Sequence, residues 1–122
     1  MENRIIVYVE DNYHNRRIVR KILTTQGYQI YEAEDGLAGL QMIKDIMPNL
    51  VLLDISLPGI DGLEIVGRLK ASEDYRHIPV IALTASAMVG DRERFLAAGC
   101  DDYLSKPVRA MTLIQMVNSW LS

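Results

Sequence analysis

Short apolar runs constrain the fold of this chain more than any other feature of its sequence. Three of them span Ile5 to Val9, Leu50 to Leu53 and Val80 to Leu83, and each is followed by a polar residue. Runs this short and this apolar predict strands buried on both faces of a sheet. Two weaker candidates, Gln29 to Ala33 and Asp102 to Leu104, add a sheet edge and a fifth strand.

Between these runs, hydrophobic residues recur at the spacing of a helix. The five helical stripes lie within Ile18–Leu23, Leu37–Met47, Leu63–Leu69, Met88–Leu96 and Leu113–Leu121. Fivefold alternation of strand and helix predicts a single α/β domain over residues 1–122, a doubly wound (βα)5 sandwich around a parallel sheet. We adopt the flavodoxin-like strand order 2-1-3-4-5 from known sheets of this type, because the sequence itself does not determine it.

Composition excludes several classes of protein. The 122 residues carry a net charge of −3, which gives no basic stripe for nucleic acid. No apolar run approaches the ~20 residues of a membrane span, and the N-terminus lacks the apolar segment of a signal peptide. The single cysteine, Cys100, allows no internal disulfide, and no Cys/His cluster has zinc spacing. We therefore expect a cytoplasmic protein with no direct nucleic-acid or membrane binding.

Polar residues follow the predicted strands at the edge where such sheets bind ligands. Glu10 and Asp11 follow the first strand, Asp54 the third, Thr84 the fourth and Lys106 the fifth. Because parallel strands end at one edge, we expect these side chains to share a crevice near the switch between strands 1 and 3. Three clustered carboxylates repel one another, and a bound Mg²⁺ would relieve that repulsion.

Each of these residues also has a plainer interpretation. Asp54 could cap a turn, Asp11 could cap the first helix, and Thr84 could cap the fourth. Asp54 closes the most hydrophobic stretch of the chain, where a carboxylate is costly to bury unless it is paired or metal-bound. Together with the two other acids, this favours a functional site. Lys106 is placed to pair with Asp54 and then with a transferred anion.

Four motifs carry a resemblance to a known family. They are Val9-Glu10-Asp11-Asn12, the stretch Leu52 to Gly62, the stretch Pro79 to Ala85, and the stretch Gly99 to Pro107. With these motifs in this order, the chain resembles the receiver domain of bacterial two-component response regulators, including the chemotaxis regulators. The likeness extends from Ile5 to Leu121.

The resemblance implies a phosphoacceptor and a metal site. Asp54 would accept the phosphoryl group, and Asp11 would bind Mg²⁺ directly, with Mn²⁺ as an alternative. Glu10 would help to hold the metal, and the backbone carbonyl of Ser56 would add a ligand. Glu10 departs from the aspartate that many members carry, and Ser56 and Ser86 occupy positions that tune dephosphorylation in the family.

The resemblance also implies a switch. Thr84 and Lys106 would bind phosphoryl oxygens, and Tyr103 would turn inward when Thr84 moves. The Lys106–Pro107 bond would be cis. The surface that changes would lie on the fourth helix, the fifth strand and the fifth helix, and it would regulate a protein partner. The protein would assist its own phosphorylation and dephosphorylation without being an enzyme in the usual sense.

The implied donor is a histidine kinase or a histidine phosphotransfer protein. We expect it to dock over the first helix, near Asn12, Asn15 and Arg16. The sequence names neither the kinase nor the downstream target. It leaves open whether the domain is a monomer or a phosphorylation-dependent dimer, and whether it is a stand-alone receiver or a module of a hybrid kinase or longer regulator.

Three other functions fit the residues less well. A flavin-binding carrier would need a Ser/Thr/Gly loop after the first strand, where Glu10 and Asp11 would repel the flavin phosphate. A phosphatase resembling haloacid dehalogenases would need a second aspartate where Ser56 stands. A docking module that works without phosphorylation would have no need of the intact set Asp11, Asp54, Thr84 and Lys106.

Overall fold

The computed structural model describes residues 4–57, 60–85 and 90–121, in which strands and helices alternate along the chain. The strands are β1 (Ile5–Val9), β2 (Gln29–Ala33), β3 (Leu50–Asp54), β4 (Val80–Thr84) and β5 (Asp102–Ser105). The helices are α1 (Tyr13–Thr24), α2 (Gly36–Ile46), α3 (Gly62–Ala71), α4 (Asp91–Ala97) and α5 (Ala110–Leu121). The expectations for Ser86 and Met88 lie outside the described residues.

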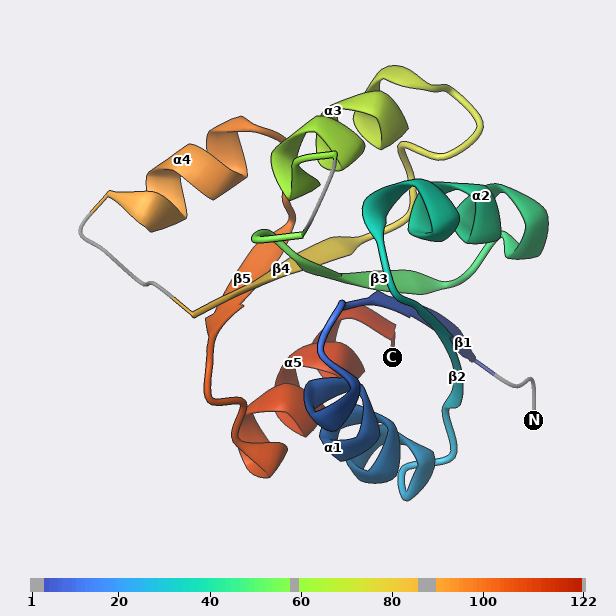
Figure 1. Ribbon diagram of the computed structural model, residues 1–122, viewed down its shortest axis with the longest axis vertical. Coiled ribbons are helices and arrows are strands. Elements are labelled where there is room, and N and C mark those ends of the chain that lie inside the picture. Colours follow the sequence, from blue (N-terminus) through green and yellow to red (C-terminus); the bar gives the residue numbers. More distant parts are fainter. Residues whose placement is uncertain (1–3, 58–59, 86–89, 122) are drawn as a thin grey trace.

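The strands form one parallel sheet in the order β2-β1-β3-β4-β5. This confirms the predicted fold class and strand order (Figure 1). Three strands run one residue further than the apolar runs suggested. Asp54 pairs in register with Leu83, and Thr84 pairs with Ser105, so these polar residues are the last members of their strands.

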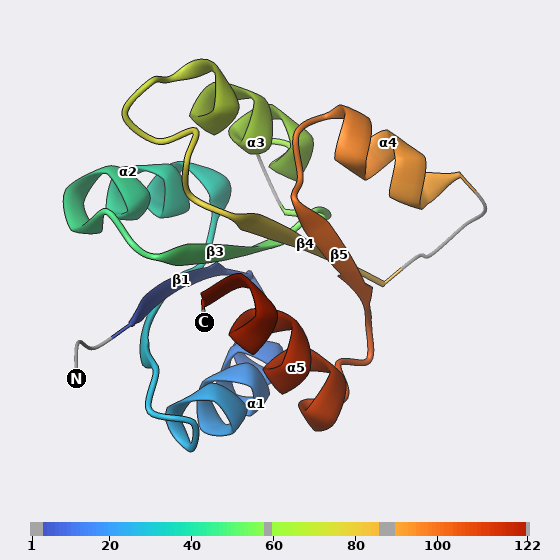
Figure 2. The ribbon, with the colours of Figure 1, turned by 180° about the vertical axis from the view of Figure 1, so that it is seen from behind.

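Helices cover both faces of the sheet. Figure 1 shows α2, α3 and α4 on one face and α1 and α5 on the other, and Figure 2 shows the same two layers from behind. Alternate residues of each strand supply the two cores, as the pleat requires. Val7 and Val51 pack towards the α2–α4 side, whereas Tyr8 and Leu52 pack towards α1 and α5.

Polar side chains start three of the helices. Asn12 accepts a hydrogen bond from the Asn15 backbone at 3.0 Å at the start of α1, and Asp35 and Asp61 do the same for α2 and α3. The alternative in which Asp11 caps the first helix is therefore wrong, because the cap lies one residue later. Likewise Gly90, and not Thr84, is the residue before α4. Asn12 and Gly90 are therefore the N-cap residues of α1 and α4.

One close approach fixes how α2 lies on the sheet. A Cβ on Gly39 would stand 2.6 Å from a methyl group of Val9, so glycine lets this helix pack directly on β1. Within the part of the chain that the structure describes, no helix combines the length and apolarity needed to cross a membrane.

Candidate phosphoacceptor and metal site

Three carboxylates meet at the carboxyl edge of the sheet. Glu10, Asp11 and Asp54 each place one oxygen within 4.8 Å of the others. Glu10 is 1% exposed and Asp54 is 4% exposed, whereas Asp11 faces solvent. The topology explains the meeting, because β1 and β3 are neighbours and end together.

Lys106 reaches this cluster from the loop after β5. Its ammonium lies 2.5 Å from Glu10 Oε1 and 3.3 Å from Asp54 Oδ2. The sequence pointed to Asp54 as its partner, and the structure places Glu10 closer. The backbone of Lys106 also donates to the Thr84 carbonyl at 2.7 Å, and the Lys106–Pro107 bond is cis.

Besides Lys106, two further groups hold the Glu10 carboxylate. The Tyr8 hydroxyl donates to Glu10 Oε1 at 3.1 Å, and the Asn12 backbone N–H donates to Oε2 at 3.3 Å. Burial, followed by the charge of Glu10, raises the pKa of Tyr8 above its ordinary value, so the hydroxyl remains a donor. Sequence reasoning missed Tyr8, although its position two residues before Glu10 places both side chains on one face of the strand.

Arg16 anchors the same loop from α1. Its guanidinium donates to the Glu10 carbonyl at 2.7 Å and lies 3.6 Å from carboxylate oxygens of both Glu32 and Glu34. The residue is 7% exposed. Arg16, which we expected near the docking surface of the first helix, is therefore buried, and its charge is paired inside the molecule. Asn12 is exposed and Asn15 is partly exposed.

The remaining predicted residues lie after β3, at the end of β4 and in β5. The Ser56 N–H donates to Asp54 Oδ1 at 3.0 Å. Asp54 therefore also caps the turn after β3, which was its alternative interpretation from the sequence. Thr84 is 4% exposed at the end of β4. Tyr103 is half-buried, and its ring meets the Phe95 ring edge-on at a centroid distance of 5.9 Å. The structure thus joins Tyr103 to α4 through Phe95.

The donor set fits a hard divalent cation. All three clustered side chains offer carboxylate oxygens, which Mg²⁺ prefers. Lys106 supplies one positive charge to three carboxylates, which leaves a surplus of two negative charges. Because Asp11 remains exposed, a metal held here would keep positions open to water or to a phosphoryl oxygen.

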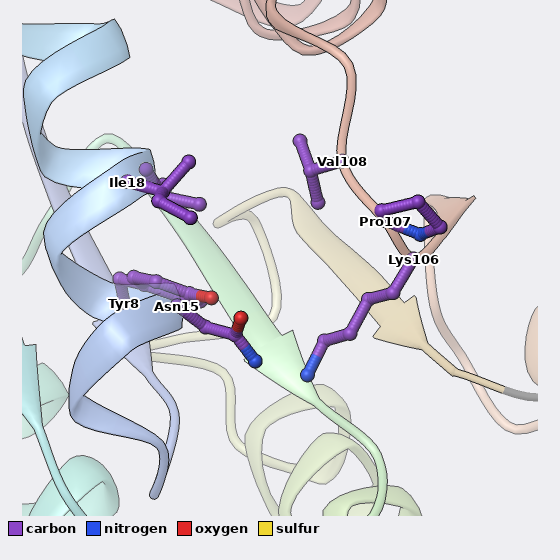
Figure 3. A pocket seen from close by; sticks show the side chains of 7 residues that line it. Tyr8, Asn15, Ile18, Lys106, Pro107 and Val108 are labelled. Carbon is purple, nitrogen blue, oxygen red and sulfur yellow. The ribbon is translucent and has the colours of Figure 1, made fainter.

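A small cavity lies beside the site, between α1 and the loop after β5. It holds about 90 Å³, and Tyr8, Asn15 and Lys106 form its polar part. Ile18, Val19, Pro107 and Val108 form its apolar part. Figure 3 shows Tyr8, Asn15 and Lys106 converging from a strand, a helix and a loop.

The sequence matches the family model described as the response regulator receiver domain, over residues 6–118. The chain belongs to this family. It is therefore a receiver domain of two-component signalling.

Relatives agree on this assignment across most of the chain. The polar-differentiation response regulator DivK of Brucella ovis is 41% identical over 116 residues, which covers 95% of this chain and 94% of DivK. DivK of Brucella anthropi is 40% identical over the same length.

Solved structures extend the likeness to three dimensions. The receiver domain of the sensor histidine kinase PA1611 of Pseudomonas aeruginosa has a TM-score of 0.89 and 34% identity, with 98% of each chain covered. That structure has a magnesium ion coordinated in its active-site cleft. The chemotaxis response regulator CheY4 of Vibrio cholerae has a TM-score of 0.91 at 23% identity, over 98% of this chain and 99% of that one, and it supports the fold.

Proposed function

We propose that this receiver domain accepts a phosphoryl group on Asp54 from a phosphohistidine of a kinase or phosphotransfer protein, with Mg²⁺, and thereby regulates a protein partner. The single observation that carries the proposal is the position of Asp54. It is a buried carboxylate beside two further acids, with an ammonium 3.3 Å away. The magnesium-bound PA1611 receiver domain supports the metal.

The transfer itself needs positioning and charge neutralisation. A carboxylate oxygen of Asp54 forms the new O–P bond while the N–P bond of the phosphohistidine breaks, and the imidazole nitrogen keeps the bonding pair. Lys106 offsets charge that gathers on the phosphoryl oxygens. Thr84, at the end of β4, would donate its hydroxyl to one of them.

The metal would be held by the side chains of Glu10, Asp11 and Asp54, with the Ser56 carbonyl as a further ligand. When bound, Mg²⁺ supplies positive charge at the phosphoryl oxygens. Mn²⁺ prefers the same oxygen donors and would serve as a substitute. Asp11 is the exposed carboxylate of the three, so the ion and the phosphoryl donor would enter from its side.

The signal would leave through α4, β5 and α5. Phosphorylation brings ~1.5–2 negative charges to Asp54. If Thr84 moves towards them, Tyr103 would follow, and its contact with Phe95 would carry the change to α4. In this proposal the protein is a switch that assists its own phosphorylation and dephosphorylation.

A kinase or phosphotransfer protein would approach over the start of α1. Asn12 is exposed there, and Tyr13 next to it is 63% exposed. The buried Arg16 would shape the surface from below. The oligomeric state of the phosphorylated form, and the target that it regulates, are separate from this docking.

The test is intact mass after incubation with acetyl phosphate, with and without Mg²⁺, on the wild type and on Asp54→Asn. We expect one phosphoryl group only on the Mg²⁺-treated wild type. If the wild type gains none, the same readout with a phosphorylated histidine phosphotransfer protein follows. Failure with both donors would refute the proposal and favour a docking module that works without phosphorylation.

A further inference from the structure

A hydroxyl inside the sheet shares its acceptor with the lysine of the site. Tyr8 is fully buried in β1, and its hydroxyl donates to Glu10 Oε1 at 3.1 Å. The same oxygen receives the Lys106 ammonium at 2.5 Å and the Asn15 side-chain amide at 3.5 Å. Two short contacts and one long contact therefore hold a carboxylate that is almost sealed from water.

The Lys106 ammonium has competing contacts. It already lies between Glu10 Oε1 and Asp54 Oδ2. The proposed function, on which this inference rests, requires the ammonium to contact a phosphoryl group on Asp54. Movement in that direction lengthens the Lys106–Glu10 contact, and the buried Glu10 oxygen then needs another donor.

We propose that Tyr8 is the positioning residue that keeps Glu10 oriented while Lys106 turns from Glu10 to the phosphoryl group. The hydroxyl approaches from the strand side, where it is fixed by a fully buried ring. A cavity of about 90 Å³ lies beside these contacts, and Tyr8, Asn15 and Lys106 form its polar part (Figure 3). Asn15, at 3.5 Å, is too distant to replace Tyr8 without moving itself.

Tyr8→Phe tests this role, because it removes the hydroxyl and keeps the ring. We expect the phosphorylation rate at saturating Mg²⁺ to fall about tenfold, the order of one hydrogen bond to a charged group. Mg²⁺ affinity, measured by calorimetry, should change by less than about twofold, because Lys106 still holds Glu10 before the donor arrives.

Tyr28→Phe is the matched control. The Tyr28 hydroxyl donates to the side chain of Asn118 in α5 and not to Glu10, so its loss removes one hydroxyl on the same side of the sheet. We expect no change in the phosphorylation rate. Equal slowing in both variants, or an unchanged rate in Tyr8→Phe, would overturn the proposal.

A double-mutant cycle with Glu10→Asp supplies a readout that does not depend on phosphorylation. The shorter acid withdraws the acceptor from Tyr8 and leaves a buried hydroxyl without it. Tyr8→Phe should therefore lower the urea midpoint of the wild type and leave that of Glu10→Asp unchanged or raised. The same loss in both backgrounds would show that Tyr8 does not act through Glu10. A wild type that gains no phosphoryl group but keeps the coupling would locate the failure in the proposed function and not in the Tyr8–Glu10 contact.

Discussion

Two lysines, one at each edge of the sheet, join loops to carboxylates, and they are used in opposite ways. At the amino edge, Lys70 lies 2.8 Å from Asp101, and each has further neutral partners. At the carboxyl edge, Lys106 lies between Glu10 and Asp54, with Asp11 close by. The first arrangement balances its charges, whereas the second has too few cations.

The amino-edge pair is closed by backbone groups. Lys70 Nζ donates to the carbonyls of Arg76 and Ile78 at 3.1 and 2.9 Å, and Asp101 accepts the Val80 N–H at 2.8 Å. These contacts fix the loop that leads into β4. They leave no surplus charge to attract a ligand, so this pair supports the fold. A surplus of carboxylates, and not the presence of an ion pair, distinguishes the candidate site.

Replacing each lysine by methionine should separate the two roles most strongly. Lys106→Met removes the cation that faces the phosphoryl group, and we expect phosphorylation by acetyl phosphate to slow at least ~100-fold. Lys70→Met should leave that rate unchanged and lower the free energy of unfolding by about 1–3 kcal/mol. Intact mass and urea denaturation measure the two effects. Similar slowing in both variants would show that the two lysines do not have different roles.

The glycine that starts α3 offers a second contrast. A Cβ on Gly62 would stand 2.8 Å from Ile55 Cα and 2.9 Å from the Asp54 carbonyl oxygen. Gly62→Ala should push α3 from the end of β3, slow phosphorylation several-fold and cost about 1–3 kcal/mol of stability.

Gly67→Ala is the control in the same helix, since a Cβ there meets no atom within 4 Å. It should leave phosphorylation unchanged and stabilise the fold by about 0.5–1 kcal/mol. If Gly62→Ala behaves like Gly67→Ala, the helix start does not position the phosphoacceptor.

Cys100→Ala, next to Asp101, should have the smallest effect on phosphorylation, and its effect should appear in the pH dependence of stability. Burial raises the pKa of the Cys100 thiol to about 11 from an ordinary 9.0. The folded state therefore binds the proton more tightly, and the resulting stability is complete below pH 9 and is lost as the pH rises through about 11. The urea midpoint should fall further between pH 8 and pH 10 in the wild type than in Cys100→Ala. An equal fall in the two proteins would contradict the effect of burial on this thiol.

The sequence predicts β1, β3 and β4 most clearly because their apolar runs are unambiguous, and it predicts the site because parallel strands end together. Three details escape it. Tyr8 is indistinguishable from the apolar residues around it, and its hydroxyl acquires meaning only beside Glu10. Arg16 looks like an ordinary exposed helix residue until the fold brings Glu32 of β2 and Glu34, just after β2, next to it. The preference of Lys106 for Glu10 depends on the loop after β5, whose path no periodicity describes.

Calorimetric titration with Mg²⁺ shows whether the surplus of carboxylates at the carboxyl edge makes a cation site. The titration compares the wild type with Asp11→Asn and Asp101→Asn, which remove one carboxylate from each edge. We predict one ion per chain for the wild type and for Asp101→Asn, and at least ~10-fold weaker binding for Asp11→Asn, because the ion loses a charged ligand. No saturable binding to the wild type, or equal binding to Asp11→Asn, would contradict the account.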